Sequence, residues 1–436
     1  MKFYNREKEV HQLRNIAEQA KSYAQMTFVV GRRRIGKTSL LLEAYKNETC
    51  LYFFVAKKNE ALLCVEFIEE IKNKLNVPIF GEIKSFKALF GLLLEVSKTQ
   101  HFTVIIDEFQ EFHTVNKTVY SEIQHLWDTQ KNESHINLVL CGSVYSLMTQ
   151  IFQNAKEPLF GRATHRLHVK AFDIYTLKQI LLDFHPDFIH EDLLALYMFT
   201  GGVAKYVELL MHSGCYTKSD FINYMFTEDS LFIDEGKNLL IEEFGKDYLN
   251  YFSILSLIAS GKTSRVEIES IMETQTGGFL DRLEQDYGLV RKIRPLFAKP
   301  NGRIVKYNIE DNFLNFWFRF IYKYRSAVES GNTDYIKQII ERDYEVYSGK
   351  ILEKYFIEHY RQSKKYNLIG TYWDRNSQNE IDIIAVNELE KSAVFVEVKR
   401  NPHKIDLSQL QKKSEHLLHH FQGFQIHYEA KSLSDM

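Results

Sequence analysis

Eight residues near the start of the chain follow the pattern Gly-x-x-x-x-Gly-Lys-Thr, which is typical of loops that bind polyphosphates. They are Gly31, Arg32, Arg33, Arg34, Ile35, Gly36, Lys37 and Thr38. The two glycines allow consecutive backbone N–H groups to point at phosphate oxygens. We expect Lys37 to reach the β- and γ-phosphates and the Thr38 hydroxyl to hold a magnesium ion. Together with Ser39, these residues form the predicted nucleotide-binding segment.

The segments on either side of this loop have the character that the motif requires. Residues 27–30 are an apolar run that predicts a buried strand, and residues 39–45 predict a helix. The N-terminus of such a helix adds the positive end of its dipole to the site. The sequence therefore predicts a phosphate loop between a strand and a helix.

A second apolar run ends in two carboxylates. Residues 102–108 predict a strand whose last two residues are Asp107 and Glu108. Nucleotide hydrolases hold magnesium and activate water with this arrangement. We expect Asp107 to bind the ion, mostly through water, and Glu108 to polarise the attacking water. A solvated strand end is the alternative, and the phosphate loop upstream favours the functional interpretation.

Two further residues are candidates for contact with the γ-phosphate. Ser143 ends the apolar run 136–143, between the phosphate loop and the acidic strand, although it is also suited to cap a helix that begins at Val144. Arg162 carries a planar guanidinium that can stabilise charge on a transferring phosphoryl group. A surface arginine is the alternative. If Arg162 acts on the ATP of a neighbouring copy, the active form is an oligomer; otherwise a monomer suffices.

The last hundred residues carry a second group of charged side chains. Residues 380–386 and 393–400 predict the two strands of an antiparallel hairpin. Alternation along a strand places Glu397 and Lys399 on the same face. Asp382, on the neighbouring strand, is expected to converge with them.

Two carboxylates and a lysine are what metal-dependent cleavage of a phosphodiester needs. Asp382 and Glu397 would bind a divalent ion, Mg²⁺ or Mn²⁺, that polarises the phosphate and lowers the pKa of a water. Lys399 would orient that water or stabilise the developing charge. Glu353, on the predicted helix 349–359, could add a further ligand. The alternative is a cross-strand salt bridge on an exposed sheet face.

Length and composition place the chain among multidomain globular proteins. It has 436 residues, too many for one ordinary core, and is 45% hydrophobic and 26% charged. No apolar run approaches the roughly 20 residues that span a bilayer, and the charged N-terminus lacks the apolar core of a signal peptide. The four cysteines show no metal-type pairing, so we expect free thiols and a cytoplasmic protein. A formal charge of −2 gives no general attraction to nucleic acid.

The order of the predicted elements divides the chain into four parts. Strands that alternate with helices over residues 1–172 indicate a parallel sheet covered by helices on both faces. Helical periodicity over residues 173–240 indicates a helical lid. Three helices and a hairpin over residues 241–325 indicate a winged helix-turn-helix and a linker helix. Residues 326–436 carry the C-terminal strands and their carboxylates.

The predicted hairpin of the winged helix is basic. Its cations are Arg291, Lys292, Arg294, Lys299, Arg303 and Lys306, with no acid between them. Such a patch can contact the phosphates of DNA, although winged helices also serve as protein–protein spacers. The aromatic run 312–322 predicts a helix buried in a core, in preference to a platform on which bases stack.

Taken together, these motifs resemble those of archaeal and bacterial AAA-type ATPases of the STAND group whose C-terminal domain is related to PD-(D/E)XK nucleases, the family known as DUF234. The resemblance covers nearly the whole chain. It is carried by residues 3–7, 31–38, 106–109, 142–143 and 161–162, by Gly201, Gly202 and Tyr206, by residues 316–320, and by Asp382, Glu397 and Lys399. Ala204 stands where many members carry proline, which affects only the lid.

The resemblance implies a P-loop NTPase core that binds ATP with magnesium. It also implies an adenine-side contact by Asn5 and Arg6, and a winged helix that joins this core to an α/β domain of the restriction-endonuclease type. The expected metals are Mg²⁺ beside the ATP and a second divalent ion in the C-terminal domain.

Two functions follow from these patterns. The first is an ATP-binding and ATP-hydrolysing switch coupled to a C-terminal domain that binds nucleic acid or cleaves it with a metal, with DNA as the expected partner. The second is a regulatory ATPase whose winged helix and C-terminal domain only bind partners, such as another protein or a second copy of the chain. A kinase is a third hypothesis, which the acidic pair and the long helical lid disfavour. No membrane partner is expected.

Overall fold

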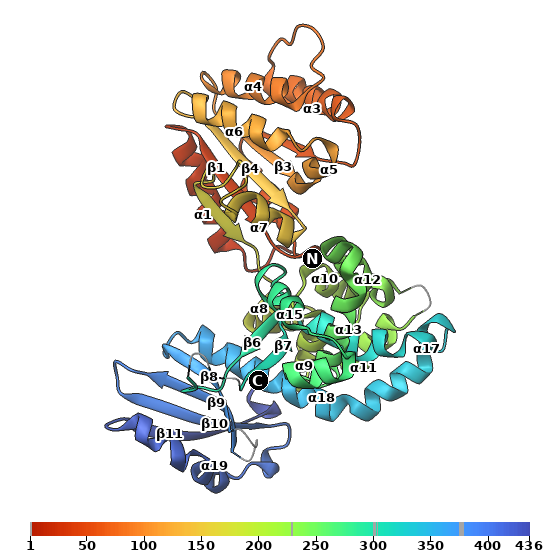
Figure 1. Ribbon diagram of the computed structural model, residues 1–436, viewed down its shortest axis with the longest axis vertical. Coiled ribbons are helices and arrows are strands. Elements are labelled where there is room, and N and C mark those ends of the chain that lie inside the picture. The colour runs from red at the N-terminus through yellow and green to blue at the C-terminus, as the bar shows by residue number, and fades with distance from the viewer. Residues whose placement is uncertain (1, 228–229, 300–301, 303, 375–378) are drawn as a thin grey trace. The chain divides into compact units, whose positions relative to one another are not determined.

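The structure, a computed structural model, describes residues 2–227, 230–299, 302, 304–374 and 379–436. The chain divides into two compact units, residues 2–171 and residues 172–436 (Figure 1). We call them the P-loop unit and the C-terminal unit, and we describe each by itself.

A five-stranded parallel sheet forms the centre of the P-loop unit. Its strands are β1 (Gln25–Val30), β2 (Cys50–Phe54), β3 (Phe102–Asp107), β4 (Ile136–Gly142) and β5 (His165–His168). Their order is β2-β3-β4-β1-β5. Every residue of β1, β3 and β4 is buried, as is usual when helices cover both faces of a parallel sheet. The predicted parallel sheet is thereby confirmed, and the carboxyl ends of β1, β3 and β4 meet at one edge.

Helices pack around this sheet. They are α1 (Glu7–Ala20), α2 (Lys37–Ala44), α3 (Glu60–Leu75), α4 (Phe86–Ser97), α5 (Phe112–Val115), α6 (Val119–Gln130) and α7 (Tyr145–Gln153), with a short 3-10 turn η1 (Phe109–Glu111). The face of α1 that carries Val10, Leu13, Ile16 and Ala17 is buried, as amphipathic spacing in the sequence indicates.

The first part of the C-terminal unit is helical, as the periodicity predicts. Its helices are α8 (Ile174–Phe184), α9 (His190–Thr200), α10 (Ala204–His212), α11 (Lys218–Met225) and α12 (Leu231–Phe244). The double glycine ends α9, with Gly201 at a φ of 58° as its C-cap. All side chains from residue 192 to residue 200 are buried, so α9 lies at the centre of this unit, and its neighbours include α8, α11, α16 and α18.

A winged-helix arrangement follows. It consists of α13 (Tyr248–Ala259), α14 (Arg265–Met272), α15 (Gly277–Gln285) and the antiparallel pair β6 (Val290–Ile293) and β7 (Lys306–Ile309). The three predicted helices are present. β7 begins at residue 306, later than the predicted 303, and Arg303 of the predicted basic patch lies outside the described residues.

The tip of this hairpin contacts the C-terminal sheet. The Leu296 N–H donates to the Thr371 carbonyl at 3.0 Å, and the Phe297 ring stacks on His420 with centroids 4.4 Å apart. Gly370 permits this approach, because a Cβ at that position would lie 2.8 Å from Leu296 Cγ. The hairpin that carries the predicted basic patch is therefore partly covered by the C-terminal sheet and by the helical segment that contains His420.

Of that patch, Arg291, Arg294 and Lys299 are exposed, and Lys292 is half-buried. Lys306 instead forms an ion pair with Glu380 at 3.1 Å. The sheet thus holds the hairpin both at its tip and at the start of β7.

The aromatic run forms α16 (Asn312–Phe316), a π-helical turn η3 (Trp317–Ile321) and a 3-10 turn η4 (Tyr322–Tyr324), before α17 (Arg325–Glu329). Its side chains are buried from residue 312 to residue 318, except for Asn315, which confirms the prediction of core packing. Trp317 Nε1 donates to the Ile233 carbonyl at 2.8 Å. Its ring packs directly against Gly236. A larger residue at position 236 would collide with this ring, because its Cβ would lie 2.2 Å from Trp317 Cδ2.

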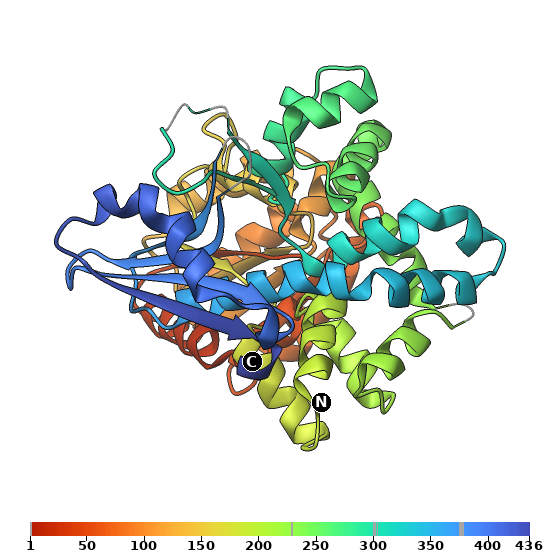
Figure 2. The same ribbon diagram turned by 90° about the horizontal axis from the view of Figure 1, so that it is seen from below.

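One long helix, α18 (Thr333–Gln362), runs beside the C-terminal sheet (Figures 1 and 2). The sheet has the order β11-β10-β9-β8 and is formed by β8 (Leu368–Trp373), β9 (Glu380–Asn387), β10 (Ser392–Lys399) and β11 (Gln425–Ser432). β9 and β10 form the predicted antiparallel hairpin, whereas β8 and β11 were not predicted. After β10 the chain forms α19 (Leu407–Ser414) and a 3-10 segment η6 (Glu415–Phe421), and the predicted helix 349–359 lies in the second half of α18.

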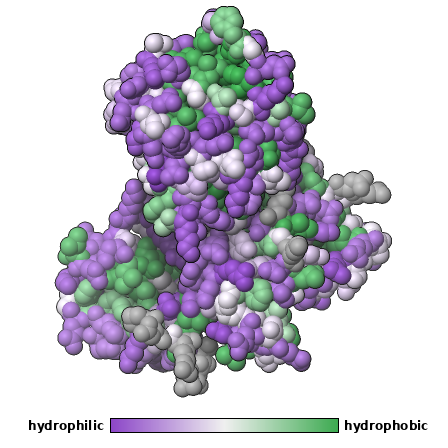
Figure 3. Space-filling model, turned by 45° about the horizontal axis from the view of Figure 1, so that its top comes forward, coloured by the Kyte–Doolittle hydropathy of each residue, from purple (hydrophilic) through white to green (hydrophobic). Residues whose placement is uncertain are grey.

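Two features bear on the expected class of protein. Among the described residues no helix is long and apolar enough to cross a membrane, and hydrophobic areas are separated by hydrophilic ones on the face shown in Figure 3. The four cysteines are free thiols, three of them buried, as expected.

A group of polar contacts joins the C-terminal sheet to the helices of the same unit. Arg400, directly after β10, forms an ion pair with Glu191 on α9 at 2.5 Å and donates to Ser348 Oγ on α18 at 2.7 Å. The Tyr197 hydroxyl on α9 donates to Glu358 Oε2 on α18 at 2.9 Å. The end of β10 is therefore fixed to both helices.

We expect Arg400→Ala to destabilise the C-terminal unit by about 1–3 kcal/mol, because the largely buried Glu191 carboxylate loses its partner. Chemical denaturation, together with limited proteolysis, measures this loss. The control is Lys21→Ala, which removes the exposed ion pair with Glu18 (2.6 Å) and should change stability by less than about 0.5 kcal/mol. Equal stabilities of the two variants would contradict the anchoring role of Arg400.

Candidate nucleotide-binding and carboxylate sites

The loop after β1 is shaped by its backbone. Gly36 precedes α2 with a φ of 92°, a conformation that a residue with a side chain rarely adopts, and Arg34 also has a positive φ of 67°. The Ile35 side chain is buried, and those of Arg33, Arg34 and Ser39 are exposed. One apolar side chain thus anchors the loop, while Arg33, Arg34 and Ser39 face solvent.

Lys37 lies within the curve of this loop. Its Nζ donates to the carbonyls of Gly31 at 2.8 Å and Arg32 at 3.1 Å, and the side chain is buried. The ammonium group is therefore held where a polyphosphate lying along the loop would meet it.

The predicted magnesium residues are in direct contact. The Thr38 hydroxyl donates to Asp107 Oδ2 at 2.7 Å, which joins the start of α2 to the end of β3. The same oxygen accepts the hydroxyl of Tyr52, on β2, at 2.8 Å, and Asp107 Oδ1 accepts the Glu108 N–H at 2.9 Å. A hydroxyl and a carboxylate brought together in this way are the hard oxygen ligands that Mg²⁺ prefers.

Glu108 turns away from the strand that precedes it. Its backbone is left-handed, with φ 53° and ψ 40°, so that its side chain leaves the alternation of β3. Its Oε2 accepts two donors, Gln110 Nε2 at 2.5 Å and Ser143 Oγ at 2.7 Å. The sequence predicts Ser143 between the phosphate loop and the acidic strand, and its side chain contacts Glu108. Ser143 is not the cap of α7, since Val144 is the residue that precedes this helix.

Asn5, Arg6 and Arg162, the other predicted nucleotide residues, lie outside the phosphate loop in the sequence. Arg6 is buried, and its guanidinium donates to the Lys170 carbonyl at 2.6 Å; Asn5, directly before it, has a left-handed backbone with φ 44°. Arg162 forms an ion pair with Asp128 at 3.1 Å and donates to its own loop. To act on a phosphate, Arg162 has to leave Asp128.

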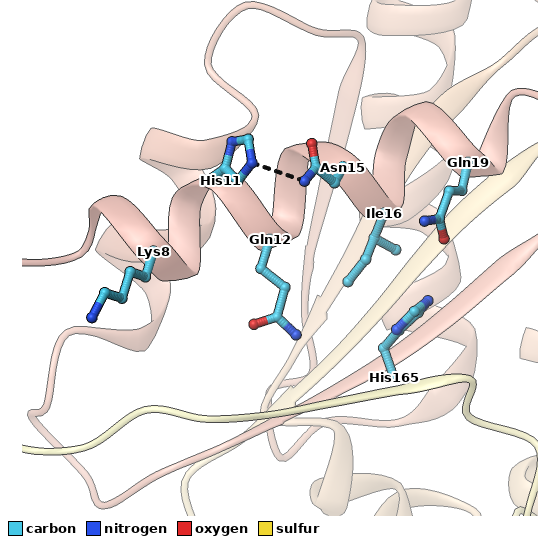
Figure 4. Close-up of a pocket in the computed structure, with 7 residues that line it drawn as sticks. All are labelled: Lys8, His11, Gln12, Asn15, Ile16, Gln19 and His165. Atoms are coloured by element: carbon cyan, nitrogen blue, oxygen red, sulfur yellow. Dashed lines mark hydrogen bonds between the residues drawn. The ribbon is translucent and has the colours of Figure 1, made fainter. Parts of the chain in front are cut away.

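A separate pocket lies against the outer face of α1 (Figure 4). Gln12, Ile16 and His165 line it from α1 and the edge strand β5, with four more residues of α1. None of the loop residues 31–38 lines it, so this pocket is distinct from the predicted phosphate site.

In the C-terminal unit, the structure brings together the residues of the predicted metal site. Lys399 Nζ lies 2.8 Å from Glu397 Oε1 and 3.4 Å from Asp382 Oδ2. Asp382 Oδ2 also accepts the Val398 N–H at 2.8 Å, and both carboxylates are buried. Lys413, on α19, lies 3.6 Å from the same Glu397 oxygen. The predicted convergence is present, and so is the ion pairing that the alternative predicts.

The charges of this group influence one another. Burial, aided by the charge of Asp382, raises the pKa of Glu353 on α18 to about 8, and burial also raises the pKa of Asp382. Burial alone would lower the pKa of Lys399, but Asp382 and Glu397 raise it above its ordinary value. Glu353 is therefore largely protonated at neutral pH, beside an ionised lysine.

One oxygen of this group has no partner. Glu397 Oε2 is buried and accepts no hydrogen bond within the described part of the chain. A buried carboxylate oxygen without a donor is costly, and a bound cation is one way to satisfy it. No group of three or more His, Cys, Asp or Glu side chains among the described residues is placed to hold a metal, so the site offers at most a pair of ligands as it stands.

Four residues of these sites were missed by sequence reasoning. Tyr52 and Gln110 contact the acidic pair, Lys413 contacts Glu397, and Arg400 fixes the end of β10. The sequence carries a weak signal only for Tyr52, which lies in the apolar run 51–55, where alternation places it on one face with residues 50 and 54.

Comparison with known proteins extends these observations. Residues 3–210 match the profile of an ATPase domain predominantly from Archaea, and residues 317–414 match a domain of archaeal and bacterial proteins of unknown function. An uncharacterized protein of Methanocaldococcus jannaschii is 30% identical over 384 residues, 85% of this chain and 82% of that protein. An uncharacterized ATP-binding protein of the same organism is 27% identical over 286 residues, 53% of this chain and 75% of that protein.

A solved structure shares the fold. The Walker-type ATPase PABY2304 of Pyrococcus abyssi aligns with a TM-score of 0.55 at 18% identity, over 72% of this chain and 96% of that one.

The raised pKa of Glu353 predicts a pH-dependent stability. In the unfolded chain this carboxyl ionises near its ordinary pKa of 4.5, whereas in the folded chain its pKa is raised to about 8. The folded state therefore binds more protons between these values, and the free energy of unfolding falls as the pH rises from about 5 to 8. Glu353→Gln, measured by chemical denaturation without divalent metal, should remove part of this fall, whereas a parallel pH profile for both proteins would contradict it.

Proposed function

The chain belongs to the family of ATPases found predominantly in Archaea that carry this C-terminal domain, and we propose that it is an ATP-hydrolysing switch coupled to a C-terminal sheet that acts on nucleic acid. The observation that carries the first half is the contact of the Thr38 hydroxyl with Asp107 at 2.7 Å, beside a Glu108 held by two donors. The second half is supported by the convergence of Asp382, Glu397 and Lys399.

ATP would bind with its polyphosphate along residues 31–38 and the adenine near Asn5 and Arg6. The buried ammonium of Lys37 would exchange the carbonyls of the loop for phosphate oxygens, which replaces neutral acceptors by charged ones. Magnesium, when bound, neutralises phosphate charge, and the oxygens of Thr38 and Asp107 would hold it.

Glu108 has the geometry of a base that orients water. Ser143 and Gln110 both donate to Oε2, which leaves Oε1 to accept a proton of the attacking water. Ser143, which touches Glu108, would also sense the γ-phosphate. Arg162 would stabilise the transferring group after release from Asp128, in its own chain or in an oligomer.

In the C-terminal sheet, Asp382 and the partnerless oxygen of Glu397 would hold a divalent ion, Mg²⁺ or Mn²⁺. Such an ion polarises a phosphodiester and lowers the pKa of its water. Lys399, which now neutralises both carboxylates, would turn toward the scissile phosphate. Glu353 would join as a ligand on losing its proton. DNA is the proposed substrate, with Arg291, Arg294 and Lys299 as exposed phosphate contacts on the wing.

One observation favours a second function, a regulatory ATPase that only binds partners. The wing tip and Lys306 are already held by the C-terminal sheet, and the carboxylates already have ion-pair partners. In that case the charged group is structural and the winged helix serves as a spacer.

We expect Lys37→Ala to reduce ATP hydrolysis to background and to weaken ATP binding, because it removes the cation that meets the phosphates. Glu108→Gln should retain ATP binding and reduce turnover by about 10²–10⁴-fold, the usual contribution of a general base. Phosphate release and fluorescent-nucleotide binding measure the two effects. Unchanged turnover in either variant would overturn the assignment of this site.

Cleavage separates the two functions. A panel of labelled DNA and RNA is incubated with Mg²⁺ or Mn²⁺, with and without ATP. Wild type should cleave nucleic acid, whereas Glu397→Gln should not cleave and should still hydrolyse ATP. The matched control is Glu388→Gln, a solvent-exposed glutamate that follows β9, which should cleave normally. Absence of cleavage by wild type in every condition, with ATP hydrolysis intact, would favour the regulatory function.

A further inference from the structure

Asp107 is held by a residue that the phosphate-loop motif does not include. Tyr52 lies on β2, the strand next to β3, and its hydroxyl donates to Asp107 Oδ2 at 2.8 Å. Tyr52 pairs in register with Ile105, two residues before Asp107. Residues two apart on a strand share a face, so the phenol reaches along that face to the carboxylate.

The hydrogen bonds distinguish the two oxygens of Asp107. Oδ2 accepts two hydroxyls, those of Thr38 at 2.7 Å and Tyr52 at 2.8 Å. Oδ1 accepts one backbone N–H, that of Glu108 at 2.9 Å. Each carboxylate oxygen offers about two acceptor positions, so the two hydroxyls fill Oδ2, whereas Oδ1 accepts a single backbone N–H.

Building on the proposed ATPase function, we propose that Tyr52 is a positioning residue of the magnesium site, which occupies Asp107 Oδ2 so that only Oδ1 is presented to the ion or its water. A single carboxylate oxygen suits Mg²⁺, which requires near-octahedral geometry and keeps its waters. Ca²⁺ instead tolerates carboxylates that bind through both oxygens. The phenol therefore biases the site toward the smaller ion.

The surroundings of the carboxylate fit this role. Asp107 is buried, so it has little access to water that could replace the Tyr52 hydroxyl as a donor. Without the hydroxyl, the carboxylate is free to rotate and to present both oxygens.

The test compares Tyr52→Phe with wild type and with Tyr45→Phe, a control that removes a buried tyrosine hydroxyl of the same unit, 3.4 Å from the Leu13 carbonyl. The probe is a fluorescent ATP analogue, whose binding is titrated with Mg²⁺ and, separately, with Ca²⁺, starting from an EDTA-treated sample. The half-saturating concentration of each metal is the readout. Melting temperatures are recorded alongside.

We expect Tyr52→Phe to raise the half-saturating Mg²⁺ concentration about tenfold, in line with residues that orient metal ligands. The half-saturating Ca²⁺ concentration should stay within about twofold of wild type, because Ca²⁺ accepts either carboxylate geometry. Tyr45→Phe should match wild type for both metals.

Two results would overturn the inference. The first is a half-saturating Mg²⁺ concentration for Tyr52→Phe equal to that of wild type. The second is an equal rise of the half-saturating concentrations of both metals together with a lowered melting temperature, which indicates only a structural role. If wild type itself binds the nucleotide without any dependence on Mg²⁺, the proposed ATPase site fails, and the inference fails with it.

Discussion

The hydrogen bond from the Thr38 hydroxyl to Asp107 connects the two halves of the nucleotide site. It requires β1 and β3 to end at the same edge of the sheet, with β4 between them, and this follows from the strand order β2-β3-β4-β1-β5. The buried apolar residues of these strands fix that order and register, since a shift of one residue would turn their side chains to the opposite face. The chemistry of the P-loop unit thus depends on the packing of strands whose own side chains take no part in it.

The C-terminal unit depends on a different constraint, the burial of charge. Asp382 and Glu397 lie in a largely apolar sheet, and Lys399 and Lys413 balance them. Breaking such a pair leaves a buried charge without compensation, so the balance limits which residues the site tolerates. The same arrangement serves a structural sheet and a metal site equally well. This is why the family relationship and the geometry support ATP hydrolysis more directly than cleavage.

Much of this arrangement was predictable from the sequence, and the exceptions have physical causes. The phosphate loop, the acidic pair and the β9–β10 hairpin were predicted because short-range patterns encode them. The place of Ser143 between the phosphate loop and the acidic strand was also predicted. Its bond to Glu108 and the donors Tyr52 and Gln110 were not, because these contacts arise from tertiary proximity. The strands β8 and β11 lack the dense apolar character of β9 and β10: most of their side chains are only half-buried or exposed, so alternation gave little signal. The extent of α18 was underestimated for a similar reason, since both its faces carry polar residues.

The length of α18 has a consequence for how such proteins diversify. This helix packs both with the helices of the unit and with the C-terminal sheet, while Arg400 reaches back to α9 and Leu296, after β6, packs against Gly370. Exchange of the sheet alone by recombination would remove the partners of α18, of α9 and of the wing. The sheet is therefore expected to be inherited together with α18 and the wing, as one evolutionary module.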